Sequence, residues 1–356
     1  MDIIRCKKCI LPETHPSISF DQNGVCNFCN EYKPITYRGE EALRKILDET
    51  ISESNWDCLV PLSGGRDSSY TLYQLVSKYG KKVLAYNYDN GFVDDAAKQN
   101  IKRIVDKLNV QVVYRKSERN IQCRHVSAIL KMNVHKTPGH VMAFLCSGCR
   151  NGIWGGAYQV AEKYKIPLIV FGESAIESGG FKKYLIPQFM PTPTEKMKFL
   201  IKKPLNFIQR KYLTFLLNKE FPLTISNQQV RKINFFDYEA WDEVKIVSTI
   251  KKYLGWRQTA ESSWRFDCHI HALVNLMVYQ LIGMTEKDEL YSRQIREGKL
   301  TREQALIRIE QANKNRTKEL DIAEKVLNHM GLNKEEKKKI LDFCSGPPKL
   351  ENRWTR

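Results

Sequence analysis

The 356-residue sequence lacks long hydrophobic runs. Its longest apolar stretch, residues 166–172, has the length of a buried strand, whereas a membrane-spanning helix needs about 20 apolar residues. The first six residues also lack the apolar segment and the cleavage site of a secretion signal. We therefore expect a cytoplasmic protein without a transmembrane segment.

The sequence also lacks the two best-known nucleotide-binding motifs. The Gly-x-x-x-x-Gly-Lys-Ser/Thr spacing of a Walker A loop is absent, and so is the Gly-x-Gly-x-x-Gly fingerprint of dinucleotide-binding folds. No internal repeat divides the chain. A nucleotide site, if present, must therefore use another loop.

Positive charge, in contrast, is in excess. The net charge is +17. The stretch from Lys182 to Lys232 contains eleven Lys and Arg but only two Glu, which gives a local charge of +9. Such a stretch attracts nucleic acid, an anionic membrane or a phosphorylated substrate, or it is only a solvated basic face. Five of the thirteen prolines also fall here, so we expect an insertion or lid with short helices over 181–236.

Apolar segments and helical patterns alternate through the first half of the chain. Strands are expected at 57–62, 82–87, 110–114 and 167–171, and helices at 39–52, 70–79, 96–108 and 152–164. This alternation predicts an α/β fold with a doubly wound parallel sheet. From residue 241 the pattern is mostly helical, and Thr301 with Gln304 matches a helix start.

These patterns predict four parts. Residues 1–35 are rich in cysteine and turns and too short to bury a core, so a metal would have to hold them. Residues 36–180 would form the nucleotide-binding domain and 181–236 the basic insertion or lid. A mostly helical C-terminal region, 237–356, would complete the site.

The most informative segment follows the first expected strand. It reads Ser63-Gly64-Gly65-Arg66-Asp67-Ser68, and a helix follows it. Glycines permit positive φ and a close backbone approach, and a helix start offers free N–H groups and a positive dipole end. With two serine hydroxyls added, the segment predicts a pyrophosphate cradle at the carboxyl end of a strand.

This segment resembles the Ser-Gly-Gly-x-Asp-Ser loop of the PP-loop ATP pyrophosphatases, which binds the β- and γ-phosphates of ATP. The resemblance implies an adenine nucleotide alpha hydrolase fold, with ATP and Mg²⁺ as cofactors. Asp67 would hold the ion on the leaving pyrophosphate, and adenine would pack near the ends of the first two strands. The implied ATP-binding residues are Pro61, Leu62, Ser63, Gly64, Gly65, Arg66, Asp67, Ser68, Asn87 and Gly172.

Six of the ten cysteines form Cys-x-x-Cys pairs. Two pairs, Cys6 with Cys9 and Cys26 with Cys29, stand sixteen residues apart. Each pair presents two thiolates to one ion, so together they predict a closed Cys₄ zinc site with a structural role. Iron in place of zinc is the alternative.

The third pair, Cys146 and Cys149, has no matching pair, and its nearest candidate partner is Cys268. A pair plus a distant single cysteine resembles the three-cysteine [4Fe–4S] site of the PP-loop tRNA-thiolating enzymes, which leaves one iron open. The alternatives are another metal bound with His269 or His271, a redox pair, or packed thiols.

Further segments resemble the N-acetyl sugar amidotransferases of bacterial surface-polysaccharide pathways, such as lipopolysaccharide O-antigen biosynthesis. Besides the phosphate loop they are residues 5–14, 18–21, 24–29, 146–149, 171–174, 177–180, 241–243, 265–268 and 295–303. The resemblance thus spans most of the chain. The family more often has Asn-Pro where Ser174-Ala175 stand and Tyr where Ser178 stands, and these positions bear on substrate choice.

The resemblance implies a reaction. The acetamido oxygen of a nucleotide-linked or otherwise activated sugar is adenylated and pyrophosphate leaves; ammonia then attacks the imidate and AMP leaves, which gives an acetamidine. Glu173 would orient the substrate or the ammonia as a second catalytic residue beside Asp67, unless it is only a helix-start acid. Arg265, Lys182 and Lys183 would meet substrate phosphates, unless they are solvated surface.

The sequence lacks the motifs of a glutaminase, and this bears on the source of the ammonia. A self-contained glutaminase needs a nucleophilic Cys with a base, or a free N-terminal Cys. Residue 2 is Asp2, and no Gly-x-Cys-x-Gly elbow occurs. We therefore expect a separate glutaminase subunit, with or without a barrel subunit, docking on the basic insertion; nucleic acid is not expected as a partner.

Two other classes fit part of the sequence. A PP-loop tRNA-thiolating enzyme would share the loop, the N-terminal zinc and the three cysteines, and would use the positive charge for salt-dependent tRNA binding. A non-catalytic zinc-ribbon module on a degenerate nucleotide fold would release no pyrophosphate from ATP. The intact Asp67 and both serines argue against the latter.

Overall fold

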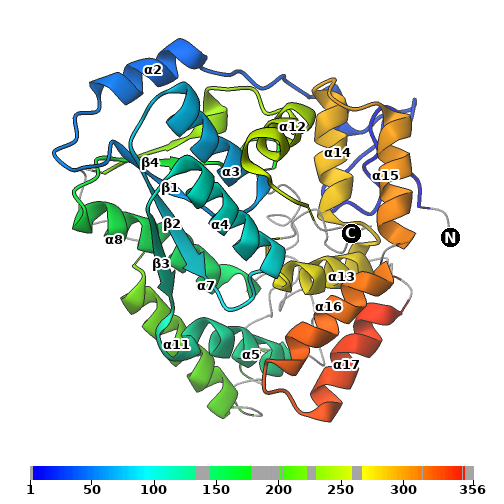
Figure 1. The fold of residues 1–356 in the computed structure, drawn as a ribbon. Coiled ribbons are helices and arrows are strands. Elements are labelled where there is room, and N and C mark those ends of the chain that lie inside the picture. The colour runs from blue at the N-terminus through cyan, green and yellow to red at the C-terminus, as the bar shows by residue number, and fades with distance from the viewer. Residues whose placement is uncertain are drawn as a thin grey trace.

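The sheet lies at the centre of the N-terminal half (Figure 1). This computed structural model describes residues 3–133, 145–177, 204–222, 230–258, 267–314 and 316–346, and the single residues 194, 197, 201 and 348. Within them, five parallel strands have the order β3-β2-β1-β4-β5. They are β1 (Cys58–Pro61), β2 (Val83–Asp89), β3 (Val112–Lys116), β4 (Leu168–Phe171) and β5 (Arg231–Asn234). The predicted doubly wound α/β fold is confirmed, and its strand order reverses between β1 and β4, where such sheets bind ligands.

Alternate side chains of each strand point to opposite faces of the sheet. Cys58 and Val60 of β1 pack in one apolar cluster, whereas Leu59 between them packs in another. In β4, Leu168 and Val170 share the face of Cys58, and Ile169 and Phe171 share the face of Leu59. All four residues of β1 are buried, as expected for a central parallel strand covered on both sides.

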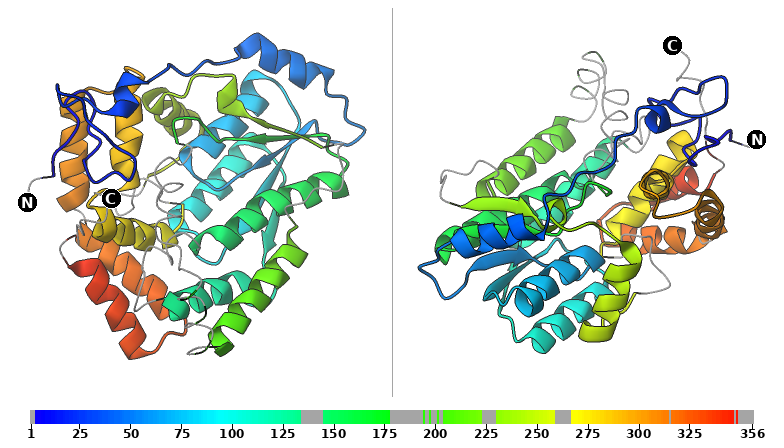
Figure 2. Two further views of the ribbon diagram at one scale, coloured as in Figure 1. Left: turned by 180° about the vertical axis from the view of Figure 1, so that it is seen from behind. Right: turned by 90° about the horizontal axis from the view of Figure 1, so that it is seen from above.

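Helices cover both faces (Figure 2). The face of Cys58 packs against α2 (Glu40–Glu49), α3 (Arg66–Tyr73), α4 (Asp95–Leu108) and α12 (Glu243–Leu254). The other face packs against α8 (Gly156–Lys163). Two helices contain π-helical turns, because η1 (Gln74–Lys78) continues α3 and η3 (Asn151–Gly155) precedes α8.

The expected elements are present with shifted ends. The helix expected at 39–52 ends at Glu49, and the helix expected at 70–79 already begins at Arg66, directly after the two glycines. Two elements were not expected: α5 (Ile121–Asn133), and β5, which adds an edge strand from within 181–236. The same stretch was expected to hold short helices, but α11 (Pro204–Glu220) has 17 residues.

The C-terminal region is helical, as predicted. It contains α13 (Ile270–Ile282), α14 (Glu286–Arg296), α15 (Arg302–Lys314), α16 (Arg316–Asn328) and α17 (Lys334–Ser345). Helix α13 is apolar on nearly every side and forms the centre of this part of the core. The predicted helix start is confirmed, since Thr301 and Gln304 exchange backbone-to-side-chain hydrogen bonds of 3.1 and 3.2 Å. The short elements are α1 (Asn27–Asn30), η2 (Glu118–Asn120), α7 (Ser147–Arg150) and η4 (Phe235–Asp237).

The N-terminal cysteine segment lies against α14 and α15 (Figure 1). Arg302 Nε of α15 donates to the carbonyl oxygen of Cys9 at 3.0 Å, and Arg5 forms an ion pair of 2.6 Å with Asp288 of α14. The first and last parts of the chain are therefore held together by charged contacts. None of the described helices is both long and apolar enough to cross a lipid bilayer.

Candidate active site

The phosphate loop occupies the end of β1 and the start of α3. Ser63 Oγ lies 3.2 Å from Ser68 Oγ and accepts a hydrogen bond from the backbone N–H of Gly65 at 3.2 Å. Gly64 has φ +78°, and a Cβ there would overlap the carbonyl oxygen of Ala97 in α4. The close packing of α4 therefore requires glycine at this position, and the loop is curled around the two serine hydroxyls as an anion cradle requires.

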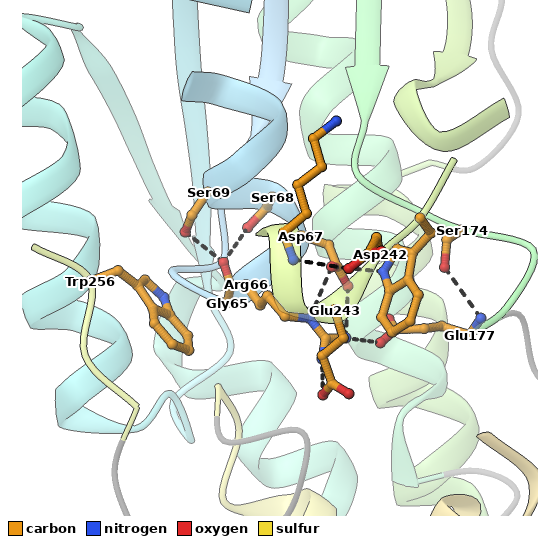
Figure 3. Close-up of polar contacts among 12 residues, drawn as sticks. Gly65, Arg66, Asp67, Ser68, Ser69, Ser174, Glu177, Asp242, Glu243 and Trp256 are labelled. Carbon is orange, nitrogen blue, oxygen red and sulfur yellow. Dashed lines mark hydrogen bonds and ion pairs between the residues drawn. The ribbon is translucent and has the colours of Figure 1, made fainter. Parts of the chain in front are cut away.

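Arg66 stands at the centre of an ion-pair network (Figure 3). Its Nε lies 3.0 Å from Asp67 Oδ1, one terminal nitrogen lies 2.9 Å from Glu243 Oε1, and the other contacts Glu177 Oε1. Glu243 in turn accepts from Arg308 of α15 at 3.0 Å. The network joins the loop to the segment after β4, to α12 and to the C-terminal helices.

The surroundings of Arg66 stabilise its charge. Burial opposes ionisation, but the carboxylates of Asp67, Glu177 and Glu243 outweigh it and raise the pKa of the guanidinium. The ring of Trp241 lies under the guanidinium at 4.8 Å and donates its Nε1–H to Asp67 at 3.0 Å. Asp67, the predicted Mg²⁺ ligand, is thus held by Arg66 and Trp241 at the start of α3.

Residues far along the chain also reach the loop. Trp256 Nε1 donates to the carbonyl oxygen of Gly64 at 3.1 Å. Asp267 Oδ2 would lie 3.4 Å from a Cβ placed on Gly65. Trp256 and Asp267 of the C-terminal region therefore border the phosphate loop.

Gly172 and Glu173 follow β4 and make contacts on different sides of the chain. A Cβ on Gly172 would lie 2.9 Å from backbone atoms of Asp67 and Ser68, so this glycine lets the chain pack against the start of α3. Glu173 has the opposite orientation: its Oε1 accepts from Trp154 Nε1 at 3.1 Å, and its Oε2 lies 3.7 Å from Lys232 Nζ. Glu177, rather than Glu173, contacts the phosphate loop.

The residues expected near adenine lie at or near the carboxyl ends of β1 and β2. Asn87 Nδ2 donates to the carbonyl oxygen of Leu62 at 2.8 Å, and the Leu62 N–H donates to the backbone carbonyl oxygen of Tyr86 at 2.7 Å. Pro61 and Leu62 are buried. These contacts extend the pairing of β1 and β2 to Leu62, the residue before the phosphate loop.

The four N-terminal cysteines converge. Their sulfur atoms all lie within 4.8 Å of one another, and all four side chains are buried. Two of the distances, 4.0 Å from Cys6 to Cys29 and 3.7 Å from Cys9 to Cys26, compare with about 3.8 Å for a tetrahedron with metal–sulfur bonds of about 2.3 Å. The site therefore fits one tetrahedral ion.

Hydrogen bonds to sulfur support thiolates at this site. The backbone N–H groups of Cys26 and Leu11 donate to Cys6 and Cys9 at 3.2 and 3.4 Å, and Arg296 approaches Cys9 at 3.6 Å. Hydrogen bonds from the Cys26 and Cys29 thiols lower the pKa of Cys9. A metal ion would replace these sulfur–sulfur contacts as the partner of each thiolate.

The second set of cysteines gathers around one amide. Asn90, after β2, donates through Nδ2 to Cys149 and to Cys268, both at 3.4 Å. Burial raises the pKa of Cys149 to about 12 and also raises that of Cys268, and the charge of Cys146 contributes to both. The structure therefore brings together the three cysteines that the sequence analysis grouped. Of the residues that the structure describes, only the N-terminal four meet as tightly as a single ion requires.

Several expected residues lie outside the described part of the chain. They are Arg265, Lys182, Lys183 and Ser178. His269 is described, and its Nε2 lies 2.7 Å from Asp94 Oδ2.

Comparison with protein families assigns the C-terminal region. Residues 247–355 match the C-terminal domain of WbpG-like lipopolysaccharide biosynthesis proteins. The chain thus carries a WbpG-like C-terminal domain. The match covers less than half of the chain and agrees with the family to which the sequence motifs pointed. Within the matched residues, Glu297 accepts a hydrogen bond from the backbone N–H of Ile35, and Arg308 contacts Glu243 at the start of α12. None of the curated proteins matches the chain significantly.

Solved structures similar to the chain include three enzymes. The U34-tRNA thiolase NcsA from Methanococcus maripaludis, with its [4Fe-4S] cluster, is 15% identical at a TM-score of 0.34, covering 94% of this chain and 90% of that one. The NH3-dependent NAD synthetase from Campylobacter jejuni is 13% identical at 0.30, covering 52% and 94%. The NMN synthetase from Francisella tularensis is 13% identical at 0.30, covering 72% and 91%. Likeness at this level says nothing about the substrate of this chain.

Sequence reasoning missed the partners of Arg66. Glu177 and Glu243 lie 111 and 177 residues away from it in the chain, and their segments had been quoted only for family resemblance. No local signal identifies them, since acids after a strand or at a helix start are common on protein surfaces. The one available hint is that Arg66 stands in a loop that binds anions, where an arginine needs carboxylate partners to stay in place.

Proposed function

We propose that the WbpG-like chain is an ATP-dependent amidotransferase that converts the acetamido group of an activated sugar to an acetamidino group. The observation that carries this proposal is the phosphate loop, curled around Ser63 and Ser68 at the carboxyl end of β1 and bordered by the WbpG-like domain. The lipopolysaccharide connection of that domain favours a sugar substrate over a nucleic acid.

Different residues of the chain would bind the phosphates and the metal ion. Backbone N–H groups at the start of α3 and the hydroxyls of Ser63 and Ser68 bind the β- and γ-phosphates. Asp67 would hold Mg²⁺, which neutralises phosphate charge when bound. The acetamido oxygen of the sugar attacks the α-phosphorus and pyrophosphate leaves; ammonia then adds to the imidate carbon, AMP leaves and a proton is lost. Catalysis at this site is mainly positioning and charge neutralisation.

The products test this function. The protein is incubated with ATP, Mg²⁺, ammonium chloride and candidate acetamido sugars, and the sugar and nucleotide products are analysed by mass spectrometry. We expect AMP and pyrophosphate, with a sugar in which NH has replaced O. Formation of ADP alone, or no ATP turnover with any acceptor, would contradict the proposal, whereas a sulfur-for-oxygen exchange on tRNA would identify a thiolating enzyme.

We also propose that the N-terminal cysteines bind a structural zinc ion. Four buried thiols leave no coordination position for substrate, so the ion would hold residues 3–35 against α14 and α15 without taking part in the reaction. Metal analysis should give one equivalent of zinc, and finding iron there would contradict this assignment.

For Cys146, Cys149 and Cys268 we propose a [4Fe–4S] cluster. Asn90 joins Cys149 and Cys268, and Cys146 belongs to the same Cys-x-x-Cys pair as Cys149, which is consistent with a cluster that needs more space than one ion. Anaerobic purification should give a visible absorption band and about four irons per chain. If anaerobically purified protein contains no iron, the cluster assignment is wrong, while the amidotransferase proposal still stands.

Ammonia, we propose, comes from a separate glutaminase in the cytoplasm. Helix α11 offers a docking face, because Leu205, Ile208, Tyr212 and Phe215 lie on one side of it and are 56–80% exposed. Ile208→Glu with Phe215→Glu should abolish glutamine-dependent activity of the complex but leave ammonium-dependent activity intact. Equal loss of both activities would show that the face is needed for folding instead.

A further inference from the structure

A group of aromatic and charged side chains at the carboxyl end of β4 has no role in the function above. Lys232 Nζ, from β5, lies 4.8 Å from the ring centroid of Trp154 and 4.7 Å from that of Phe171. Glu173 joins Lys232 and Trp154 through contacts of 3.7 and 3.1 Å. Arg150 stands over the ring of Trp154 at 5.7 Å. We call Arg150, Trp154, Glu173 and Lys232 the tryptophan platform.

The platform is accessible to a ligand. Arg150 and Lys232 are exposed, Trp154 is half-buried, and 46% of the Glu173 side chain is exposed. A tryptophan used only for the core would be covered by apolar neighbours, whereas here two cations lie beside the indole and a carboxylate accepts from its Nε1. Such an arrangement resembles a sugar site, where an aromatic face stacks on the ring and charged groups bind its substituents.

Trp154 is held rigidly in a rare backbone conformation. It belongs to the π-helical turn η3, a conformation found often at functional sites. Tyr86 donates its hydroxyl to the carbonyl oxygen of Gly152 at 2.6 Å, and Asn151 donates to Asn218 of α11 at 2.6 Å. The turn is thus anchored to β2 on one side and α11 on the other, which fixes the position of the indole before any ligand arrives.

The platform also lies next to the phosphate loop. Gly172 packs on the backbone of Asp67 and Ser68, and the next residue, Glu173, belongs to the platform. Cys149 of the second cysteine set directly precedes Arg150. A molecule on Trp154 would therefore sit at the same edge of the sheet as the ATP phosphates.

We propose that the tryptophan platform binds the acceptor, a phosphate-linked acetamido sugar. The sugar ring stacks on Trp154, its hydroxyls donate to Glu173, and its phosphates lie against Lys232 and Arg150. The charges match this class of ligand, since two cations suit a phosphate or diphosphate and one carboxylate suits sugar hydroxyls. This inference rests on the proposed function and gives the WbpG-like chain a defined acceptor site.

Binding to the full-length protein without ATP tests the inference. N-acetylglucosamine, its 1-phosphate and UDP-N-acetylglucosamine serve as probes, with calorimetry or saturation-transfer NMR as the measurement. We expect the two phosphorylated probes to bind more tightly than the free sugar. Lys232→Ala should weaken only those two, by about tenfold, and Trp154→Ala should weaken all three by about tenfold.

Matched variants separate binding from folding. Trp154→Phe keeps an aromatic face and should retain most of the affinity. Lys163→Ala removes a cation that stands over Tyr164 at the far end of α8, at 5.3 Å, and should leave all three affinities unchanged. The inference is wrong if the wild-type protein binds none of the probes, or if Trp154→Ala and Lys232→Ala bind them as the wild type does. It is also wrong if Trp154→Ala weakens ATP binding instead, because the platform would then hold adenine.

The two proposals fail in different ways. If the probes bind through Trp154 and Lys232 but ATP is never converted to AMP, the sugar site stands and the amidotransferase reaction does not. If acceptor-dependent AMP forms while the variants keep the wild-type KM for the acceptor, the reaction stands and this location for the acceptor is wrong.

Discussion

Arg66 shows how one side chain can hold a loop together. It carries a single positive charge but touches three carboxylates, those of Asp67, Glu177 and Glu243, and stacks on Trp241. A lysine could not serve all three, because an ammonium is a point charge, whereas the planar guanidinium presents several N–H groups in fixed directions. The cradle thus depends on a residue that need not itself touch ATP.

Replacing Arg66 should therefore cost stability as well as activity. Arg66→Gln removes the cation that contacts all three carboxylates, of which Glu243 still keeps Arg308, and we expect the free energy of unfolding in urea to fall by about 2 kcal/mol, since the guanidinium is largely buried. The control is Arg44→Gln, which breaks an exposed pair with Glu40 and should cost less than about 0.5 kcal/mol. Equal effects of the two substitutions would mean that the network contributes no more than a surface ion pair.

Gly64 offers a second test at the residue scale. Gly64→Ala places a methyl group against the carbonyl oxygen of Ala97, whereas Gly80, with a similar φ of +64°, has nothing within 4 Å of an added Cβ. Both substitutions strain the backbone by about 1 kcal/mol, but only the first should displace α4 and abolish ATP binding. Thermal unfolding and ATP titrations of the two variants measure this difference, and normal ATP binding by Gly64→Ala would contradict it.

At the scale of elements, the contact between α5 and α11 depends on an uncharged histidine. Burial lowers the pKa of His125 to about 4, and its Nε2 lies 3.1 Å from Thr214 Oγ1. The Thr214 hydroxyl donates to the backbone carbonyl oxygen of Arg210 at 2.9 Å, so the hydrogen between His125 and Thr214 comes from the imidazole. Among the residues that the structure describes, its buried Nδ1 has no partner that could accept a second proton.

This arrangement sets a pH dependence. The native pKa of about 4 lies below the unfolded value of about 6.5, so between these values the unfolded chain binds more protons and stability falls as pH falls. The contribution of His125 is complete above about pH 6.5 and is lost as pH approaches 4, by up to about 3 kcal/mol. Urea unfolding at several pH values should show a steeper fall for the wild type than for His125→Gln. Parallel curves for the two proteins would contradict this assignment.

At the scale of the whole molecule, the N-terminal cysteine segment joins the two ends of the chain. It contacts α14 and α15 through Arg5, Arg296 and Arg302, and Ile10 packs in an apolar cluster with Ala305 and Ile309 of α15. A segment of this size would not fold alone, so we expect a metal ion on the four cysteines to hold it together with the C-terminal helices. The C-terminal helices in turn contact the phosphate loop network through Arg308.

Metal removal should therefore act beyond the cysteines. With a chelator, or in Cys26→Ser, we expect hydrogen exchange to rise over residues 3–35 and also over α14 and α15, while the sheet keeps its protection. Cys123→Ser, which changes a half-exposed thiol elsewhere, should retain the metal and the wild-type exchange pattern. Unchanged exchange in α14 and α15 after metal loss would show that these helices do not depend on the segment.

The features that could be predicted from the sequence are local ones. The apolar period and the turn residues placed β1 and the phosphate loop, the spacing of Cys6, Cys9, Cys26 and Cys29 predicted their convergence, and Thr301 with Gln304 marked a helix start. Each of these signals acts within a few residues or through one metal ion, so a reading of the chain can find it. Strand β5, in contrast, is a short, mostly exposed edge segment whose pattern is weak, and it was missed.

The tertiary structure alone decided which side chains meet. Glu173 points to Trp154 while Glu177 reaches Arg66, and nothing in their shared sequence environment distinguishes the two acids. Their contacts follow from the path of the chain after β4, which brings Glu173 to Trp154 and Glu177 to an arginine more than a hundred residues away. Local propensities act between neighbours in the chain, whereas contacts such as those of Arg66 form only when the sheet and the C-terminal helices have packed.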